Sequence, residues 1–113
     1  MAPRYNPPMD VTAGGEPGMT LGVVQVRLRL PSRTLKEKRT IVKSVVERLR
    51  ERFNAAVAEG GPLDDVSLAT ITAACVSNEA RHATAQIQAI ADAVAGWRLD
   101  AELISVETEL IRL

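Results

Sequence analysis

Residues 21–53 have the sequence LGVVQVRLRLPSRTLKEKRTIVKSVVERLRERF, in which the spacing of the apolar residues changes once. From Leu21 to Leu30 the residues alternate, which is the period of a half-buried β-strand: Val24, Val26, Leu28 and Leu30 share one face, and Val23, Gln25, Arg27 and Arg29 share the other. Pro31 ends this strand because it has no backbone N–H to donate. From there to Phe53, apolar residues recur at helical spacing. The stretch therefore predicts a strand followed by a long helix.

The start of that helix carries a capping signal. Thr34 and Glu37 have the three-residue spacing of a capping box, in which the Thr34 hydroxyl accepts from the amide of residue 37 and Glu37 reaches back. The apolar face of the helix consists of Leu35, Val42, Val45, Val46, Leu49 and Phe53. We therefore expect the helix to begin at residue 34 or 35 and to end near residue 53.

The second half of the chain repeats the pattern. Residues 55–59 predict a weak strand, and the β-branched, uncharged residues 66–76 predict a central strand beyond a turn at Gly60-Gly61-Pro62. A second helix follows, with Ser77 and Asn78 as N-cap residues and a stop at Gly96. Its buried face consists of Ala80, Ala83, Ile87, Ile90 and Val94. Residues 99–110 alternate again, so the predicted order is βαββαβ.

This order predicts an α+β fold of the ferredoxin-like kind: a βαββαβ sandwich in which a four-stranded antiparallel sheet carries two helices on one face. We expect the first and third strands to be parallel neighbours in its centre. The domain is expected over residues 19–113. Residues 1–18 contain four prolines and three glycines without an apolar period, which predicts a disordered N-terminal tail.

The composition limits the function. Aromatic residues make up only 3% of the chain, which predicts an aliphatic core and no aromatic platform for stacking bases. A lone Cys75 and a single His82 predict no internal disulfide and no structural zinc site. Since we find no phosphate-binding loop, triad or metal-ligand spacing, we expect no catalytic residues, metal or cofactor, and a protein that is not an enzyme. Without a membrane-length apolar run or a signal peptide, a cytoplasmic protein is expected.

Charge is unevenly distributed along the chain. Residues 27–52 hold ten Lys or Arg against three Glu, whereas residues 53–113 hold nine acids against three Arg. On a helical projection Lys36, Arg39, Lys43 and Arg50 fall within an arc of about 60° beside the apolar face. Such a stripe is suited to contacting phosphates and makes RNA a candidate partner. A solvated amphipathic helix gives the same pattern.

Two further features of the predicted fold bear on partners. Arg27 and Arg29 share one face of the first strand, and Glu107 and Glu109 share one face of the last. We expect these charges to pair across the strands, and a sheet face without helices is also a candidate homodimer surface.

A small anion site is a second candidate. If the first and third strands are parallel, both helices begin at the same edge of the sheet and bring together Ser32, Arg33, Thr34, Ser77 and Asn78, with His82 nearby. Free amides at two converging helix N-termini attract anions. Capping alone also explains Thr34 and Asn78.

Four segments carry a resemblance to a known family: Leu30-Pro31-Ser32-Arg33-Thr34-Leu35-Lys36-Glu37-Lys38-Arg39, the segment from Arg52-Phe53-Asn54 to Val57-Ala58-Glu59, Val76-Ser77-Asn78, and Ser105-Val106-Glu107-Thr108-Glu109. Together they resemble the YlxP-like family of small bacterial proteins of unknown function, from about Met19 to the end of the chain. The resemblance implies a ferredoxin-like domain. The genes of this family commonly lie near those of translation initiation factor two and ribosome-binding factor A, so the resemblance also implies a role connected with the ribosome or RNA.

Two hypotheses follow. The first is an RNA- or ribosome-associated accessory protein that contacts phosphates through the stripe on the first helix. The alternative is a self-associating structural or regulatory module that binds a small anion between the helix starts.

Overall fold

The computed structural model describes residues 18–97 and 100–113. Its elements follow in the order β1 (Thr20–Arg29), α1 (Leu35–Arg52), β2 (Ala56–Gly60), β3 (Leu68–Ser77), α2 (Ala80–Gly96) and β4 (Glu102–Arg112). This is the βαββαβ order expected from the sequence. Of the tail predicted over residues 1–18, all but Gly18 lies outside the described residues. No helix within the described ranges has the length and apolarity to cross a membrane.

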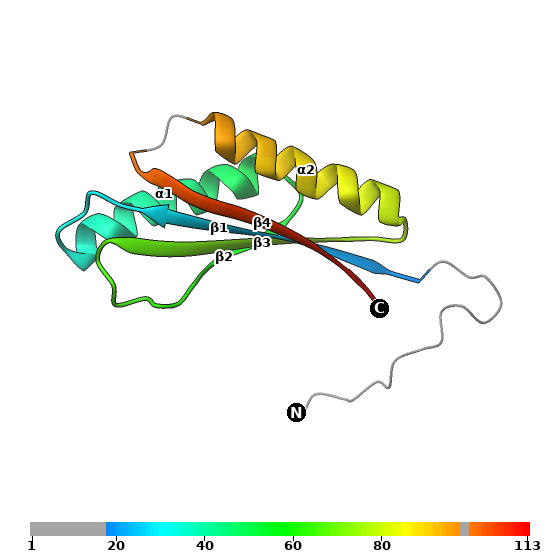
Figure 1. The fold of residues 1–113 in the computed structure, drawn as a ribbon, viewed down its shortest axis with the longest axis horizontal. Helices are drawn as coiled ribbons and strands as arrows, with labels where there is room; N and C mark the ends of the chain where they lie inside the picture. Colours follow the sequence, from blue (N-terminus) through cyan, green and yellow to red (C-terminus); the bar gives the residue numbers. More distant parts are fainter. Residues whose placement is uncertain (1–17, 98–99) are drawn as a thin grey trace, which may run out of the picture.

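The four strands form one sheet in the order β2-β3-β1-β4, and every neighbouring pair is antiparallel. Both helices lie on the same face of this sheet (Figure 1). α1 packs on β2 and β3, whereas α2 packs on β1, β3 and β4. These features confirm the predicted α+β, ferredoxin-like arrangement.

The prediction that β1 and β3 are parallel is wrong. Thr20 lies opposite Ser77 and Arg29 lies opposite Leu68, so the two central strands run in opposite directions. The reason is the crossover: α1 carries the chain from β1 to a position two strands away, and β3 then returns from β2 by a hairpin into the gap. β3 is therefore antiparallel to both of its neighbours.

The core between the sheet and the helices is aliphatic, as expected. It consists mainly of Val24, Val26, Leu28, Val42, Val45, Leu49, Ile71, Ile87, Ile90 and Val94, each at most 5% exposed. Phe53 and Trp97 are only partly buried at its margin. Gly22 allows α2 to approach β1 closely, since a Cβ atom at this position would lie 2.6 Å from Cγ2 of Ile87. Burial at this density leaves little room for a larger side chain.

The edge strand β4 contains a bulge. Ser105 lies opposite Arg27 and Leu103 lies opposite Leu28, which leaves Ile104 as the extra residue. Beyond the bulge, Arg29 faces Glu102 with its Nε atom 3.7 Å from the carboxylate, and both side chains are exposed. An exposed pair of this kind contributes at most about 1 kcal/mol.

The expected pairing of Arg27 and Arg29 with Glu107 and Glu109 is therefore wrong. Glu107 lies opposite Gln25 and Glu109 lies opposite Val23 in the β1–β4 register. Antiparallel pairing places the acidic end of β4 beside the start of β1, whereas the two arginines lie at the end of β1. Among residues 18–97 and 100–113, Glu102 is the one acidic residue that forms an ion pair with either arginine.

Candidate nucleic-acid interface on α1

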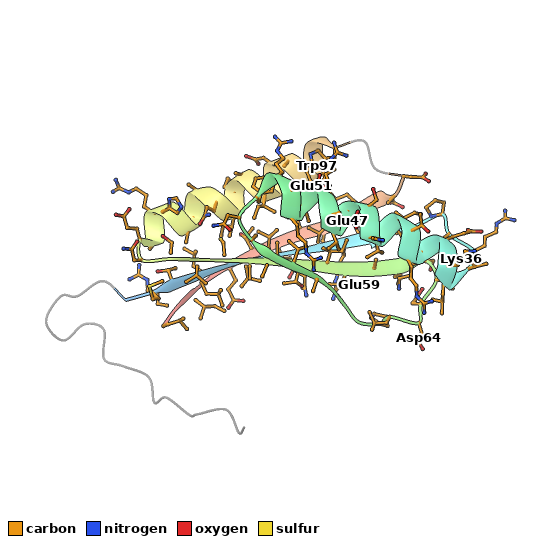
Figure 2. The ribbon with its side chains drawn as sticks, turned by 180° about the vertical axis from the view of Figure 1, so that it is seen from behind. Lys36, Glu47, Glu51, Glu59, Asp64 and Trp97 are labelled. Atoms are coloured by element: carbon orange, nitrogen blue, oxygen red, sulfur yellow. The ribbon has the colours of Figure 1, made fainter. Side chains whose placement is uncertain are left out.

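Helix α1 begins where the capping box predicts. The Glu37 amide donates to Oγ1 of Thr34 at 3.1 Å, and Glu37 Oε2 accepts from the amide of Arg33 at 2.9 Å. The carboxylate thus reaches the residue before the cap rather than the cap itself. These two bonds hold the first turn, from which Lys36 projects near the end of the molecule (Figure 2).

We call Lys36, Arg39, Lys43 and Arg50 the basic stripe; all four residues are exposed. Within the described part of the chain, Lys36 and Arg39 have no ion-pair partner. Their charges are therefore open to solvent or to a ligand. They lie one helical turn apart, so they can act on the same ligand.

The other two members of the stripe have partners within the chain. Lys43 lies 3.9 Å from Glu47, one turn further along the helix, with both side chains in water. Such a pair contributes only a few tenths of a kcal/mol and leaves the ammonium accessible. Arg50 donates from Nη2 to the Val57 carbonyl at 2.6 Å, which ties the end of α1 to β2. Arg50 therefore has a structural role, and the stripe borders the β2 edge of the sheet.

The basic stripe is bordered by acidic residues on its solvent side. Glu47 and Glu51 lie on the exposed side of α1 (Figure 2). Together with Thr40, Lys43, Ser44 and Arg48 they line a surface depression on the helix. Arg48 is also held over the Trp97 ring, with its guanidinium carbon 4.2 Å from the ring centroid. The free positive charge of α1 is thus concentrated at the N-terminal half of the helix.

Lys38 departs from the expectation that the cations of this helix face water. It is 1% exposed, and its Nζ lies 3.1 Å from the Pro62 carbonyl, 3.4 Å from that of Leu63 and 2.5 Å from that of Asp65. The same ammonium lies 3.3 Å from Oε2 of Glu59. Oε2 of Glu59 accepts no hydrogen bond from the described residues, so the attraction between Glu59 and Lys38 is that of an ion pair.

Lys38 therefore anchors the β2–β3 loop to α1. Its four oxygen neighbours come from β2 and the loop after it, and none comes from its own helix. One signal in the sequence marks this residue: on the helical projection it falls between Val45 and Leu49, inside the apolar arc. The charge of Lys38 alone does not reveal this position, whereas its helical spacing does.

The predicted anion site does not form, because the helix starts lie at opposite ends of the sheet. Ser32, Arg33 and Thr34 follow the end of β1, whereas Ser77 and Asn78 lie beside its beginning, where Ser77 pairs with Thr20. The antiparallel course of β1 and β3 separates the two groups by the length of a ten-residue strand, about 30 Å.

The expected capping of α2 is wrong as well. The N-cap residue is Glu79, without a side-chain capping bond, and the Ser77 hydroxyl instead accepts from the Glu79 amide at 3.1 Å. At the other end, Ser32 is buried and donates to the Val66 carbonyl. Both serine hydroxyls are thus used in hydrogen bonds to the backbone of the chain itself.

Two further titratable groups, Cys75 and Asp65, take part in packing and in a turn. Burial raises the pKa of the Cys75 thiol, which lies among aliphatic side chains, and a thiol in this state is a poor nucleophile. The Asp65 carboxylate accepts from the amide and hydroxyl of Ser67, at 2.9 and 3.1 Å, and these hydrogen bonds lower its pKa. Residues 18–97 and 100–113 contain no group of three His, Cys, Asp or Glu placed to hold a metal ion.

Comparison with known proteins identifies a family and leaves the activity open. No curated protein matches the chain significantly. One family profile, described as protein of unknown function (DUF503), matches residues 21–108, which is most of the chain and includes α1 with its capping box. The YlxP-like resemblance is compatible with this assignment. The chain therefore belongs to the DUF503 family of proteins of unknown function.

Proposed function

We propose that this protein is a non-catalytic, cytoplasmic accessory protein that binds RNA, as free rRNA or in the ribosome, through the basic stripe of α1. The observation that carries the proposal is the state of Lys36 and Arg39. Both are exposed on neighbouring turns, and within the described residues neither is neutralised by an acidic side chain. Cations that remain uncompensated on one helix face are suited to contacting phosphates.

The buried Lys38 sharpens this argument. It lies between Lys36 and Arg39 in sequence, yet its charge is satisfied by Glu59 and three carbonyls. Packing therefore accounts for one cation of the Lys-Glu-Lys-Arg run and leaves two without a structural role. The gene neighbourhood implied by the YlxP-like resemblance supports an RNA partner over other polyanions.

The proposed contact is with the phosphate backbone and not with bases. The stripe contains no aromatic side chain, so the stacking that usually holds unpaired bases is not available there. Affinity then comes from counterion release, is largely independent of sequence and falls steeply with salt. Glu47 and Glu51 weaken binding at the C-terminal half of α1, so we expect Lys36, Arg39 and Lys43 to contribute most.

The test is a binding isotherm for the full chain, by fluorescence anisotropy on a labelled rRNA fragment and by sedimentation with ribosomal subunits, between 50 and 300 mM salt. Each lost phosphate contact on single-stranded RNA reduces the salt slope by about 0.7. The double variant Lys36→Ala/Arg39→Ala should therefore reduce the slope by about 1.4 and weaken binding at every salt concentration.

A matched control removes two exposed arginines elsewhere. Arg81→Ala/Arg112→Ala causes the same loss of charge on α2 and β4, and it should change the slope much less. An equal effect of both double variants would mean that only the net charge matters, and the stripe would not be the site. Absence of binding by the unaltered chain to both rRNA and subunits would refute the proposal.

A further inference from the structure

One face of the sheet is not covered by any described element. Both helices lie on the opposite face, over the core (Figure 1). We call the uncovered side the outer face. It is formed by alternate residues of the strands, among them Leu21, Val23, Gln25 and Arg27 of β1 and their partners in β3 and β4. In its middle, β2 and β3 contribute small or β-branched side chains such as Ala58, Thr72 and Ala74, whereas Gln25 of β1 lies beside Glu107 of β4.

The outer face has an aliphatic end. Leu21 lies opposite both Val76 and Ile111, which places these three side chains in one row across β3, β1 and β4. Met19 and Leu113 form the next row, joined by a hydrogen bond from the Leu113 amide to the Met19 carbonyl. Met19, Val76 and Leu113 are 43%, 58% and 57% exposed. A cluster of this kind, rimmed by polar side chains, is typical of an interaction surface.

The opposite end of the outer face is charged. Arg27 and Arg29 lie at the end of β1, and only Arg29 has an ion-pair partner, Glu102 of β4, within the described residues. Between the two ends, Glu107 and Glu109 lie along the β4 margin of the face. Acidic side chains thus follow one border of the face, and cations lie inside it.

From this pattern we infer that the protein forms a homodimer in which the outer faces of two copies pack against each other. The inference is independent of RNA binding. A two-fold axis parallel to the strands places β1 of one copy over β3 of the other and β4 over β2. This arrangement stacks the aliphatic ends on each other, with Val76 above the partner's Leu21. It also separates the two acidic borders by the width of the sheet.

The area of the outer face suffices for such a dimer. β1 and β3 are ten residues long, and the sheet has four strands. At about 3.3 Å per residue and about 4.8 Å per strand, the length and width of the sheet give a face of about 600 Å² per copy. Two copies bury about 1,200 Å², the lower limit of stable specific interfaces. The dimer is therefore expected to be in equilibrium with the monomer at micromolar concentrations rather than permanent.

Pairing through the free edge of β4 is the competing arrangement, and the sequence of that strand opposes it. Antiparallel pairing of two β4 strands about their midpoint would bring the Glu107 and Glu109 side chains of the two copies close together, and like charges on facing strands destabilise a strand pair. The bulge at Ile104 also interrupts the edge, which is a common device against edge-to-edge pairing.

The mass of the full chain in solution tests the inference, measured by sedimentation equilibrium from 5 to 300 μM. The unaltered chain should approach twice 12.2 kDa at the upper concentrations. Val76→Glu places a carboxylate in the centre of the aliphatic end, and burial without a partner should raise the dimer dissociation constant at least 100-fold. Thr72→Arg, in the middle of the outer face, should do the same.

The control is Leu63→Glu, which puts the same charge on an equally exposed aliphatic residue of the β2–β3 loop and should leave the dimer intact. Circular dichroism melts of all variants separate loss of the dimer from loss of the fold. A monomeric unaltered chain at 300 μM would overturn the inference. So would a dimer that survives both Val76→Glu and Thr72→Arg, because its interface would then lie elsewhere, as at the β4 edge.

Discussion

Replacement of Lys38 by methionine tests the most unusual contact in the molecule. Methionine retains the length and apolar stem of the side chain but removes the ammonium group. Three loop carbonyls and the Glu59 carboxylate then lose the donor that lies 2.5 to 3.4 Å from them. Because Glu59 is only 20% exposed, its charge is left without compensation in a largely buried place.

The magnitude follows from that geometry. Removing one member of a buried ion pair costs about 3–5 kcal/mol. A domain of this size has a total free energy of unfolding of about 5–15 kcal/mol, so Lys38→Met should remove a large part of it. Lys38→Ala should cost about 2 kcal/mol more, because it also removes three buried methylene groups at about 0.8 kcal/mol each.

Urea unfolding followed by far-ultraviolet circular dichroism gives the free energies, and a thermal melt should show a decrease in Tm of more than 10 °C for Lys38→Met. Lys43→Met is the matched control, since the Lys43 ammonium is exposed and meets only Glu47 at 3.9 Å; it should change stability by less than about 0.5 kcal/mol. If the two variants proved equally stable, Lys38 would have to reach water, and the anchoring of the β2–β3 loop described above would be refuted.

Four other substitutions test separate features of the fold. Gly22→Ala should destabilise the protein by about 1–3 kcal/mol in urea unfolding, since its Cβ atom would meet a buried side chain of α2 at 2.6 Å. Gly96→Ala, with no atom within 4 Å of its Cβ position, should be neutral or stabilising. Thr34→Ala removes the N-cap of α1 and should cost about 1 kcal/mol in the same assay. The pKa of Asp65 is lowered, chiefly because its carboxylate accepts a hydrogen bond from the Ser67 amide. The contribution of this carboxylate to folding stability is therefore complete above the unfolded-state pKa near 3.8, and it is lost as pH falls through the lower folded-state pKa. Unfolding curves should therefore show a stability difference between Asp65→Asn and the unaltered chain that is constant above pH 5 and shrinks below pH 4.

The order and type of the elements were predictable from local sequence because each element repeats its signal many times. The alternation in β1 involves eight consecutive residues, and the buried positions match those predicted, including Val24, Val26 and Leu28. The face of α1 was likewise identified by a set of aliphatic residues, four of which are buried, so a single exception such as Lys38 does not change its position. The capping box was found because Thr34 and Glu37 are neighbours in sequence.

Most of the features that were missed depend on partners distant in sequence. The side-chain oxygen and carbonyls around Lys38 belong to residues 21 to 27 positions away, and no local pattern announces them. The pairing of Arg29 with Glu102 depends on a bulge in β4, which shifts the register by one residue. The anion site failed for a different reason: one wrong strand direction moved Arg33 and Asn78 from the same edge of the sheet to opposite edges.

The two proposed surfaces lie on opposite sides of each chain, which makes their tests independent. α1 lies on the covered face of the sheet and the proposed dimer uses the other face, so the two basic stripes of a dimer would point away from each other (Figure 1). Two sheets about 10 Å apart, each with its helices on the far side, place the stripes on opposite sides of the dimer, so one straight stretch of phosphates does not contact both. Each stripe should therefore bind a separate RNA segment and release the counterions of that segment. It follows that Val76→Glu should dissociate the dimer and leave the salt slope of RNA binding per chain unchanged. Lys36→Ala/Arg39→Ala should lower that slope and leave the molar mass in solution unchanged. A change of both properties by either variant would show that the surfaces are coupled, contrary to the layer arrangement of the fold.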